Sequence, residues 1–123
     1  MDNLKLELRL CEKLGLTPTP TPGQTWFCNG VLGCACQIGE ATVWQPFEVG
    51  AEWFRFTDEG LTFVFRPTLE EILGQIPDFV ISKNGTNTGK WMVKNFQNGT
   101  SIAKYADSIW VAAAALLWAR NEK

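Results

Sequence analysis

The feature that most constrains the fold is an uninterrupted apolar run near the C-terminus, residues 109–119. Its eleven residues carry no polar side chain, whereas a helix that crosses a membrane needs about 20 such residues. Asp107 or Ser108 supplies an N-cap, so the run predicts a helix of a soluble protein over residues 109–120. A surface helix needs one apolar stripe, but this helix is apolar on every side and must be covered on every side.

Two arrangements cover such a helix: burial within its own domain, or contact with a second copy of the chain. The alanines at residues 112–115 let a neighbouring backbone approach closely, while two tryptophans overhang the other side. We therefore take Trp110, Ala114 and Trp118 as a candidate oligomer interface and expect a homo-oligomer.

The N-terminal segment, residues 4–14, alternates leucine with charged residues as a strand does, yet its residues are good helix formers. Gly15 fits the left-handed position that ends a helix, and Leu16 fits the apolar contact that follows it. We predict a helix over residues 4–14. Residues 17–23 alternate threonine and proline and form an extended connector.

Residues 24–66 are predicted to be rich in β-structure. The clearest part is a hairpin, in which strands at residues 52–57 and 61–66 flank a turn that ends at Gly60. Two weaker strands, residues 26–28 and 41–47, are separated by glycine interruptions at Gly30, Gly33 and Gly39.

A second helix is predicted over residues 69–76, because Thr68 and Glu71 form a capping box and Pro77 ends the helix. A strand meander over residues 78–105 follows, with a tight turn at Asn98-Gly99. The chain of 123 residues therefore predicts one domain, residues 1–123, of the α+β class. Its expected architecture is a layered helix–sheet–helix sandwich with a mainly antiparallel sheet.

The composition argues against catalysis. The chain has no histidine, so it lacks the commonest general base and the commonest metal ligand. Its four cysteines do not have zinc-site spacing, and we expect buried, unreactive thiols and no metal or cofactor. They are Cys11, Cys28, Cys34 and Cys36.

The adjacent acids Asp58-Glu59 and Glu70-Glu71 lie in a turn and in the first turn of a helix, where acids have structural roles. No catalytic residue is therefore assigned. A small enzyme that uses these carboxylates, or Cys34 and Cys36, is the remote alternative.

The net charge of −2 and the pI near 5.1 argue against a protein that binds duplex nucleic acid. The eleven basic residues are scattered and form no stripe along the sequence. The first residues have no signal-peptide pattern and no segment is long enough to span a membrane, so we expect a cytoplasmic protein with reduced cysteines.

Six tryptophans in so small a domain cannot all be deep core. One or two could line a cleft and stack on a planar ligand. We name Trp26, Arg66, Lys90 and Trp91 as candidate ligand-binding residues, because they lie at strand ends near loops. A nucleotide-like small molecule is the ligand that such a cleft suits.

The order of motifs in the second half of the chain is similar to that of a known group of proteins. This plan consists of four features in order: residues 67–73 (PTLEEIL), residues 90–93 (KWMV), the turn at Asn98-Gly99, and residues 107–109 (DSI) before an alanine- and leucine-rich helix. This order resembles small phage- and prophage-encoded proteins with an α/β/α sandwich domain. The resemblance covers about residues 61–120, and the cysteine-bearing stretch, residues 27–39, has no counterpart in it.

The resemblance implies a viral origin, a location in the cytoplasm of a bacterial host, and no catalytic residue. It also implies an accessory protein that binds a host component and interferes with host processes or defences. The sequence therefore predicts a binding protein. Its partner is either a host protein or a nucleotide-like small molecule that it sequesters.

Overall fold

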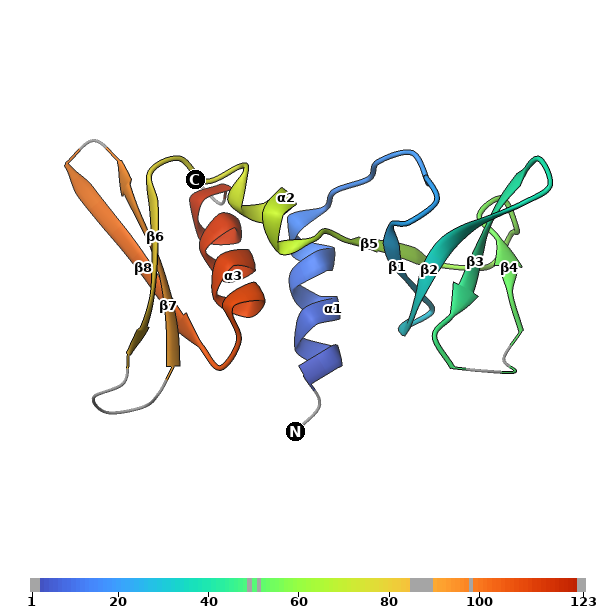
Figure 1. Ribbon diagram of the computed structural model, residues 1–123, viewed down its shortest axis with the longest axis horizontal. Helices are drawn as coiled ribbons and strands as arrows, with labels where there is room; N and C mark the ends of the chain where they lie inside the picture. The colour runs from blue at the N-terminus through green and yellow to red at the C-terminus, as the bar shows by residue number, and fades with distance from the viewer. Residues whose placement is uncertain (1–2, 49, 51, 85–89, 98, 122–123) are drawn as a thin grey trace. The chain divides into compact units, whose positions relative to one another are not determined.

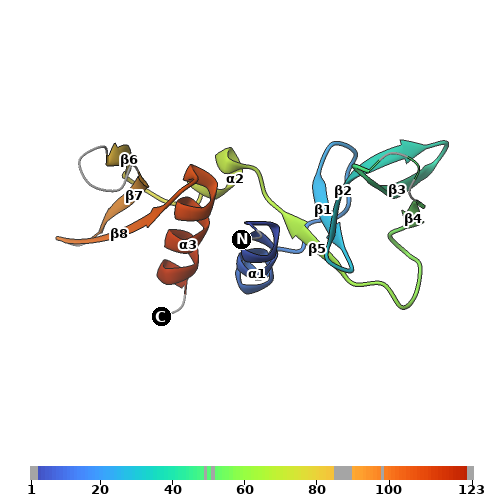
Figure 2. The same cartoon turned by 90° about the horizontal axis from the view of Figure 1, so that it is seen from below.

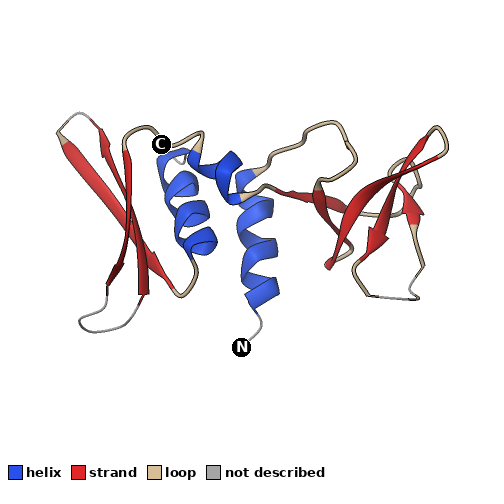
Figure 3. Ribbon diagram, in the orientation of Figure 1, coloured by secondary structure: helices blue, strands red, loops and turns tan. Residues whose placement is uncertain are grey.

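The computed structural model describes residues 3–48, 50, 52–84, 90–97 and 99–121. The chain forms two compact units, Met1–Pro67 and Thr68–Lys123, and the single domain expected from the sequence remains a prediction. Each unit contains an antiparallel sheet against which a helix packs (Figures 1 and 3). The predicted α+β class with antiparallel sheets is confirmed, although the strands divide between two sheets, of five and three strands.

The first unit opens with a helix and continues as a five-stranded sheet in the order β4-β3-β2-β1-β5. The first four strands follow one another as a meander, and the last returns to pair with the first. The elements are α1 (Asn3–Leu14), β1 (Thr25–Cys28), β2 (Val31–Ile38), β3 (Ala41–Pro46), β4 (Phe54–Arg55) and β5 (Phe63–Arg66).

Helix α1 ends as the sequence predicted. Gly15 has a φ of +64°, and its N–H donates to the carbonyl of Cys11 at 3.1 Å. The helix packs against β5, where Arg66 Nε donates to Glu7 Oε1 at 2.7 Å. Cys11 is 2% exposed on the packed side, so the helix contributes a thiol to the interior.

The predicted hairpin between residues 52–57 and 61–66 is wrong. Strand β4 pairs with β3 and strand β5 pairs with β1, so the two segments are not neighbours. The reason is packing: β5 places Phe65 beside Trp26, with the ring centroids 5.2 Å apart in the core. Asp58 closes the intervening turn, accepting a hydrogen bond from the N–H of Arg55 at 3.0 Å.

Of the three glycine interruptions predicted from the sequence, Gly30 and Gly39 lie in turns, whereas Gly33 lies within a strand. Asn29 and Gly30 have φ values of 48° and 87°, and they form the tight turn between β1 and β2. Gly33 lies inside β2. A Cβ there would lie 2.3 Å from the carbonyl oxygen of Gln45 and 2.6 Å from the Trp44 ring, so the sheet requires glycine.

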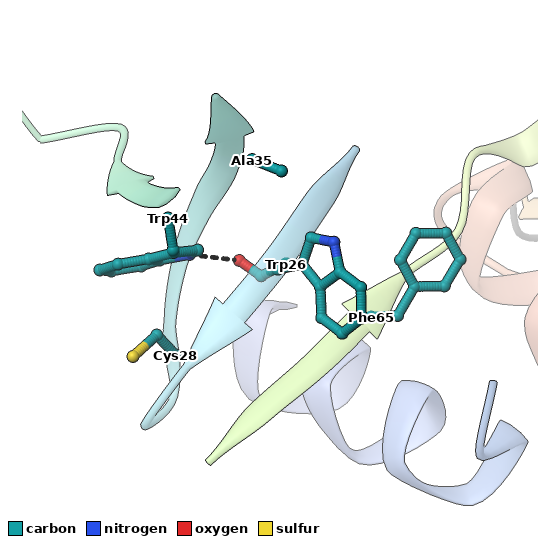
Figure 4. Packing of buried hydrophobic residues seen from close by; sticks show 5 residues of the cluster. All are labelled: Trp26, Cys28, Ala35, Trp44 and Phe65. Atoms are coloured by element: carbon teal, nitrogen blue, oxygen red, sulfur yellow. Dashed lines mark hydrogen bonds between the residues drawn. The ribbon is translucent and has the colours of Figure 1, made fainter. Parts of the chain in front are cut away.

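The core of the first unit is aromatic (Figure 4). Trp44 is 2% exposed, and its indole N–H donates to the carbonyl of Trp26 at 3.0 Å. This hydrogen bond joins β3 to β1 across the intervening strand β2. Trp26 packs edge-on against Phe56 at 5.3 Å. The buried cluster consists of Trp26, Cys28, Ala35, Trp44 and Phe65.

The second unit places a helix on one face of a three-stranded sheet in the order β6-β7-β8 (Figures 1 and 2). The last helix contacts β7 and β8, and the short helix α2 also packs against it. The elements are α2 (Leu69–Leu73), β6 (Phe79–Asn84), β7 (Lys90–Gln97), β8 (Thr100–Ala106) and α3 (Ile109–Asn121).

The start of α2 is the predicted capping box. Glu71 N–H donates to Thr68 Oγ1 at 3.1 Å, and Thr68 N–H donates to Glu71 Oε1 at 2.9 Å. The helix ends at Leu73, three residues earlier than predicted, and continues as turns to Ile76. Of the predicted turn at Asn98-Gly99, Gly99 has a φ of 77° and Asn98 lies outside the described residues.

Helix α3 is capped by Ser108, whose Oγ accepts from the N–H of Val111 at 3.1 Å. Trp110 and Ala114 are 7% and 0% exposed within the chain, and Trp118 is half-buried. Trp110 and Ala114 therefore need no second copy to cover them, and the homo-oligomer remains a prediction. Among the described residues, no helix has the length and apolarity to span a membrane.

The burial of Cys11 makes the stability of the protein depend on pH. Burial raises the pKa of its thiol from 9.0 to about 12, and the nearby Arg66 guanidinium opposes the shift without cancelling it. The thiol is neutral in both states below pH 9, but above pH 9 it ionises more readily in the unfolded chain. The stability advantage of wild type over Cys11→Ala should therefore shrink above pH 9, by up to about 1.4 kcal/mol per pH unit.

This advantage is measured by urea denaturation at pH 8, 9.5 and 10.5. The difference between the two proteins isolates Cys11 from every group that both proteins share. A constant difference across these pH values would contradict the expectation.

Candidate functional site

The four residues that the sequence grouped as a ligand site divide between the two units, and in each unit the two residues lie on opposite faces of a sheet. In the first unit, Arg66 pairs with Thr25 while Trp26 pairs with Phe65, so the side chains of Trp26 and Arg66 lie on opposite faces of the sheet. Trp26 is 5% exposed, and its indole N–H donates to Gln24 Oε1 at 3.0 Å. Trp26 thus serves the core, and Arg66 is held by Glu7 of α1.

In the second unit, Lys90 and Trp91 are consecutive residues of β7, so their side chains also lie on opposite faces. Trp91 shares the face of Val93 and Asn95, which are 0% and 1% exposed and lie on the side covered by α3. Lys83 Nζ lies 5.6 Å from the centroid of the Trp91 ring. A ligand on one face of this sheet can contact Lys90 or Trp91, but not both.

The opposite face of this sheet, turned away from α3, gathers aromatic and basic side chains. We call it the outer sheet face. The register places Met92 opposite Tyr105 and Ser82, and Lys94 opposite Ala103 and Val80. Its members are Val80, Ser82, Lys90, Met92, Lys94, Phe96, Ser101, Ala103 and Tyr105.

The rings on the outer sheet face are accessible. Phe96 is 48% exposed and Tyr105 is 55% exposed, and Val80 on the same face is 44% exposed. Lys94 Nζ lies 5.0 Å from the centroid of the Phe96 ring, which is cation–π distance. An ammonium group thus lies beside an exposed ring, an arrangement that suits a ligand with both negative charge and a planar group.

All the charged residues of this sheet are lysines, so its charge is positive. Residues 79–106 contain four lysines and no aspartate or glutamate. Lys90 and Lys94 belong to the outer sheet face, and Lys83 and Lys104 belong to the face of α3. The outer sheet face therefore carries two lysines and no acidic residue among its members, although the whole chain has a net charge of −2.

The two rings are far apart. Ser101, the partner of Phe96, lies four residues from Tyr105 along β8, so the backbone positions that carry the two rings are about 14 Å apart along the strand. A single base that stacks on one ring cannot reach the other. A ligand that uses both rings must therefore be longer than one nucleotide.

Two of the acidic side chains singled out from the sequence have structural roles. Asp58 closes a turn and Glu71 completes the capping box, as the sequence predicted for acids at these places. Among the described residues, no three histidine, cysteine or acidic side chains form a group that could hold a metal. Cys11 and Cys28 are buried as predicted, but Cys34 and Cys36 are partly exposed, so the prediction of four buried thiols is wrong for this pair.

Comparison with known protein families, with characterised proteins and with solved structures finds no match for this chain. The resemblance to phage and prophage proteins, and the viral origin that it implies, remain predictions.

Sequence reasoning missed Met92, Lys94, Phe96 and Tyr105, although a signal was present. Along β7, Lys90, Met92, Lys94 and Phe96 recur at every second position, so they share one face of a strand. Basic residues inspected as a continuous run look scattered. With a period of two, Lys90 and Lys94 of this strand fall on one face together with Met92 and Phe96.

Proposed function

We propose that the chain is a binding protein without catalytic activity, and that the outer sheet face binds single-stranded nucleic acid. The observation that carries the proposal is the combination of exposed Phe96 and Tyr105 with Lys90 and Lys94 on one face, in a sheet without acidic residues. Proteins that bind single strands combine rings on which bases stack with cationic groups that track the phosphates.

A polymer fits this face better than the nucleotide-like small molecule expected from the sequence. Small ligands bind in cavities that enclose most of their surface. Phe96 and Tyr105 are about half exposed on a sheet, so neither ring is part of such an enclosure. Affinity on an open face must come from repeated contacts, which a strand with several bases and phosphates provides.

The charge distribution also separates a single strand from other partners. A duplex hides the faces of its bases and presents mainly phosphates, for which this chain has few clustered cations. A generic protein partner gives no reason for a sheet with four lysines and no acid. The predicted role, binding a host component, is compatible with a host or viral single strand.

Fluorescence anisotropy with a labelled single strand of about 12 nucleotides tests the proposal. Phe96→Ala and Tyr105→Ala should each weaken binding roughly tenfold, because loss of a stacked base costs about 1–3 kcal/mol. Lys94→Gln should lower the slope of log affinity against log salt by about 0.7, as expected for one lost phosphate contact. These side chains are partly or largely exposed, so the variants should keep the wild-type fold.

Phe47→Ala and Trp53→Ala are matched controls, because these aromatic side chains are 57% and 47% exposed in the first unit. They should bind the strand as wild type does. Equal losses in controls and outer-face variants would contradict the assignment. If an unlabelled mononucleotide displaces the labelled strand as well as an unlabelled strand does, the result would favour a protein that sequesters a nucleotide-like small molecule. If the chain shows no salt-dependent binding of either ligand, both functions would be rejected.

A further inference from the structure

Cys34 and Cys36 form a pair of adjacent thiols on β2. Residues two apart in a strand lie on the same face, and here the two Sγ atoms are 3.2 Å apart. Both side chains are partly exposed, whereas Cys11 and Cys28 are buried. This pair belongs to the first unit and has no part in the outer sheet face of the second.

The register partners of the two thiols are uncharged residues. Cys34 lies between Thr25 of β1 and Gln45 of β3. Cys36 pairs with Val43 of β3 and is followed by the exposed residues Gln37 and Ile38. Val43 is 1% exposed and supplies an apolar floor on the same face. No acidic or basic side chain is a register partner of either thiol, so the site offers two sulfur donors.

Two sulfur donors restrict the ligand. Zinc prefers four ligands in a tetrahedron, and the described residues hold no group of three potential ligands. Hard cations such as magnesium and calcium require oxygen ligands. Thiolate donors select soft ions, and monovalent copper is stable with two thiolates alone.

We propose that Cys34 and Cys36 chelate a soft, thiophilic cation, with monovalent copper as the ion that this pair of donors suits. On binding, each thiol releases its proton to solvent and each sulfur forms one bond to copper. Two protons leave for each ion bound, and neither copper nor sulfur changes oxidation state. Because both side chains are partly exposed, the sulfurs can separate by rotation about χ1 without opening the core.

Copper binding is measured anaerobically by competition with a chromogenic chelator of monovalent copper. Wild type should bind one ion per chain. Cys34→Ser and Cys36→Ser should each weaken binding at least tenfold, because either change leaves a single soft donor. Circular dichroism verifies that both variants are folded, as expected for replacements at partly exposed positions.

Phenylarsine oxide provides a second probe, because it forms a stable ring with two neighbouring thiols. Two sulfur–arsenic bonds form, and the arsenic oxygen leaves as water with the two thiol protons. Intact-mass spectrometry in excess monothiol should show one adduct on wild type and none on Cys34→Ser or Cys36→Ser.

Cys28→Ala and Cys11→Ala are controls that each remove one thiol and leave the pair intact. Both should keep the copper affinity and the arsenical adduct. Unchanged copper affinity in Cys34→Ser and Cys36→Ser, or loss in the folded controls, would overturn the assignment. Failure of this test leaves the nucleic-acid proposal unaffected, since that proposal rests on residues of the other unit.

Discussion

Gly33→Ala should destabilise the first unit by about 3 kcal/mol, because the added methyl group has no space. Its Cβ would lie 2.3 Å from the backbone oxygen of Gln45 and 2.6 Å from the Trp44 ring. The oxygen belongs to β3, which pairs with β2, so it can move only if the sheet opens. Trp44 is 2% exposed and hydrogen-bonded to the Trp26 carbonyl, so its ring is also fixed.

The loss is measured by urea denaturation, followed by the near-ultraviolet circular dichroism of the tryptophans. Gly74→Ala is the matched control, because its backbone has a φ of −62° and its Cβ would lie no closer than 3.3 Å to another atom. The control should change the free energy of unfolding by less than about 1 kcal/mol. A Gly33→Ala protein within that same margin would refute the steric argument.

Gly33 also shows why the first half of the fold resisted prediction. Local signals dominate the predictions that are confirmed: the capping box of Thr68 and Glu71, the left-handed Gly15 and the Ser108 cap each act within a few residues. The pairing of β5 with β1 joins residues about forty positions apart, and it depends on aromatic packing that no local pattern records. Gly33 has the same origin, because the residue that excludes a side chain there lies on another strand.

The residues of the candidate site also include some that a local pattern predicts and some that only the strand pairing reveals. Sequence reasoning identified Lys90 and the strand that carries it, but joined Lys90 to its neighbour Trp91 although alternation places them on opposite faces. Tyr105 could not be added without the register of β8 against β7, since it meets Met92 only across the sheet. The pattern of one strand was readable, whereas a face made by three strands required the structure.

Asn95→Asp should strongly destabilise the second unit, because the amide of Asn95 is buried. Asn95 is 1% exposed on β7, and its Nδ2 donates to the carbonyl of Pro77, which fastens the turn after α2 to the sheet. Its Oδ1 is buried without a hydrogen-bond partner among the described residues. Asn95→Asp replaces the donor with an oxygen that faces a carbonyl and buries a negative charge, so it should cost about 3–5 kcal/mol at pH 7.

The pH dependence separates this electrostatic cost from a loss of packing. Burial disfavours the ionised acid, so its pKa in the folded variant lies above the unfolded value of about 3.9. The variant should therefore approach wild-type stability near pH 4, where the acid is protonated, and lose about 1.4 kcal/mol per pH unit above it until the folded pKa is reached. Lys104, diagonally placed on the same face, offsets part of the charge and limits the loss.

Urea denaturation between pH 4 and pH 7 measures the difference between Asn95→Asp and wild type. Asn121→Asp is the control, because Asn121 is exposed at the end of α3 and its change should cost less than about 1 kcal/mol, with little pH dependence. A deficit for Asn95→Asp that is the same at both ends of the range would assign the loss to shape. A deficit that grows with pH assigns it to the buried charge, and shows that the amide donor to Pro77 is what this position requires.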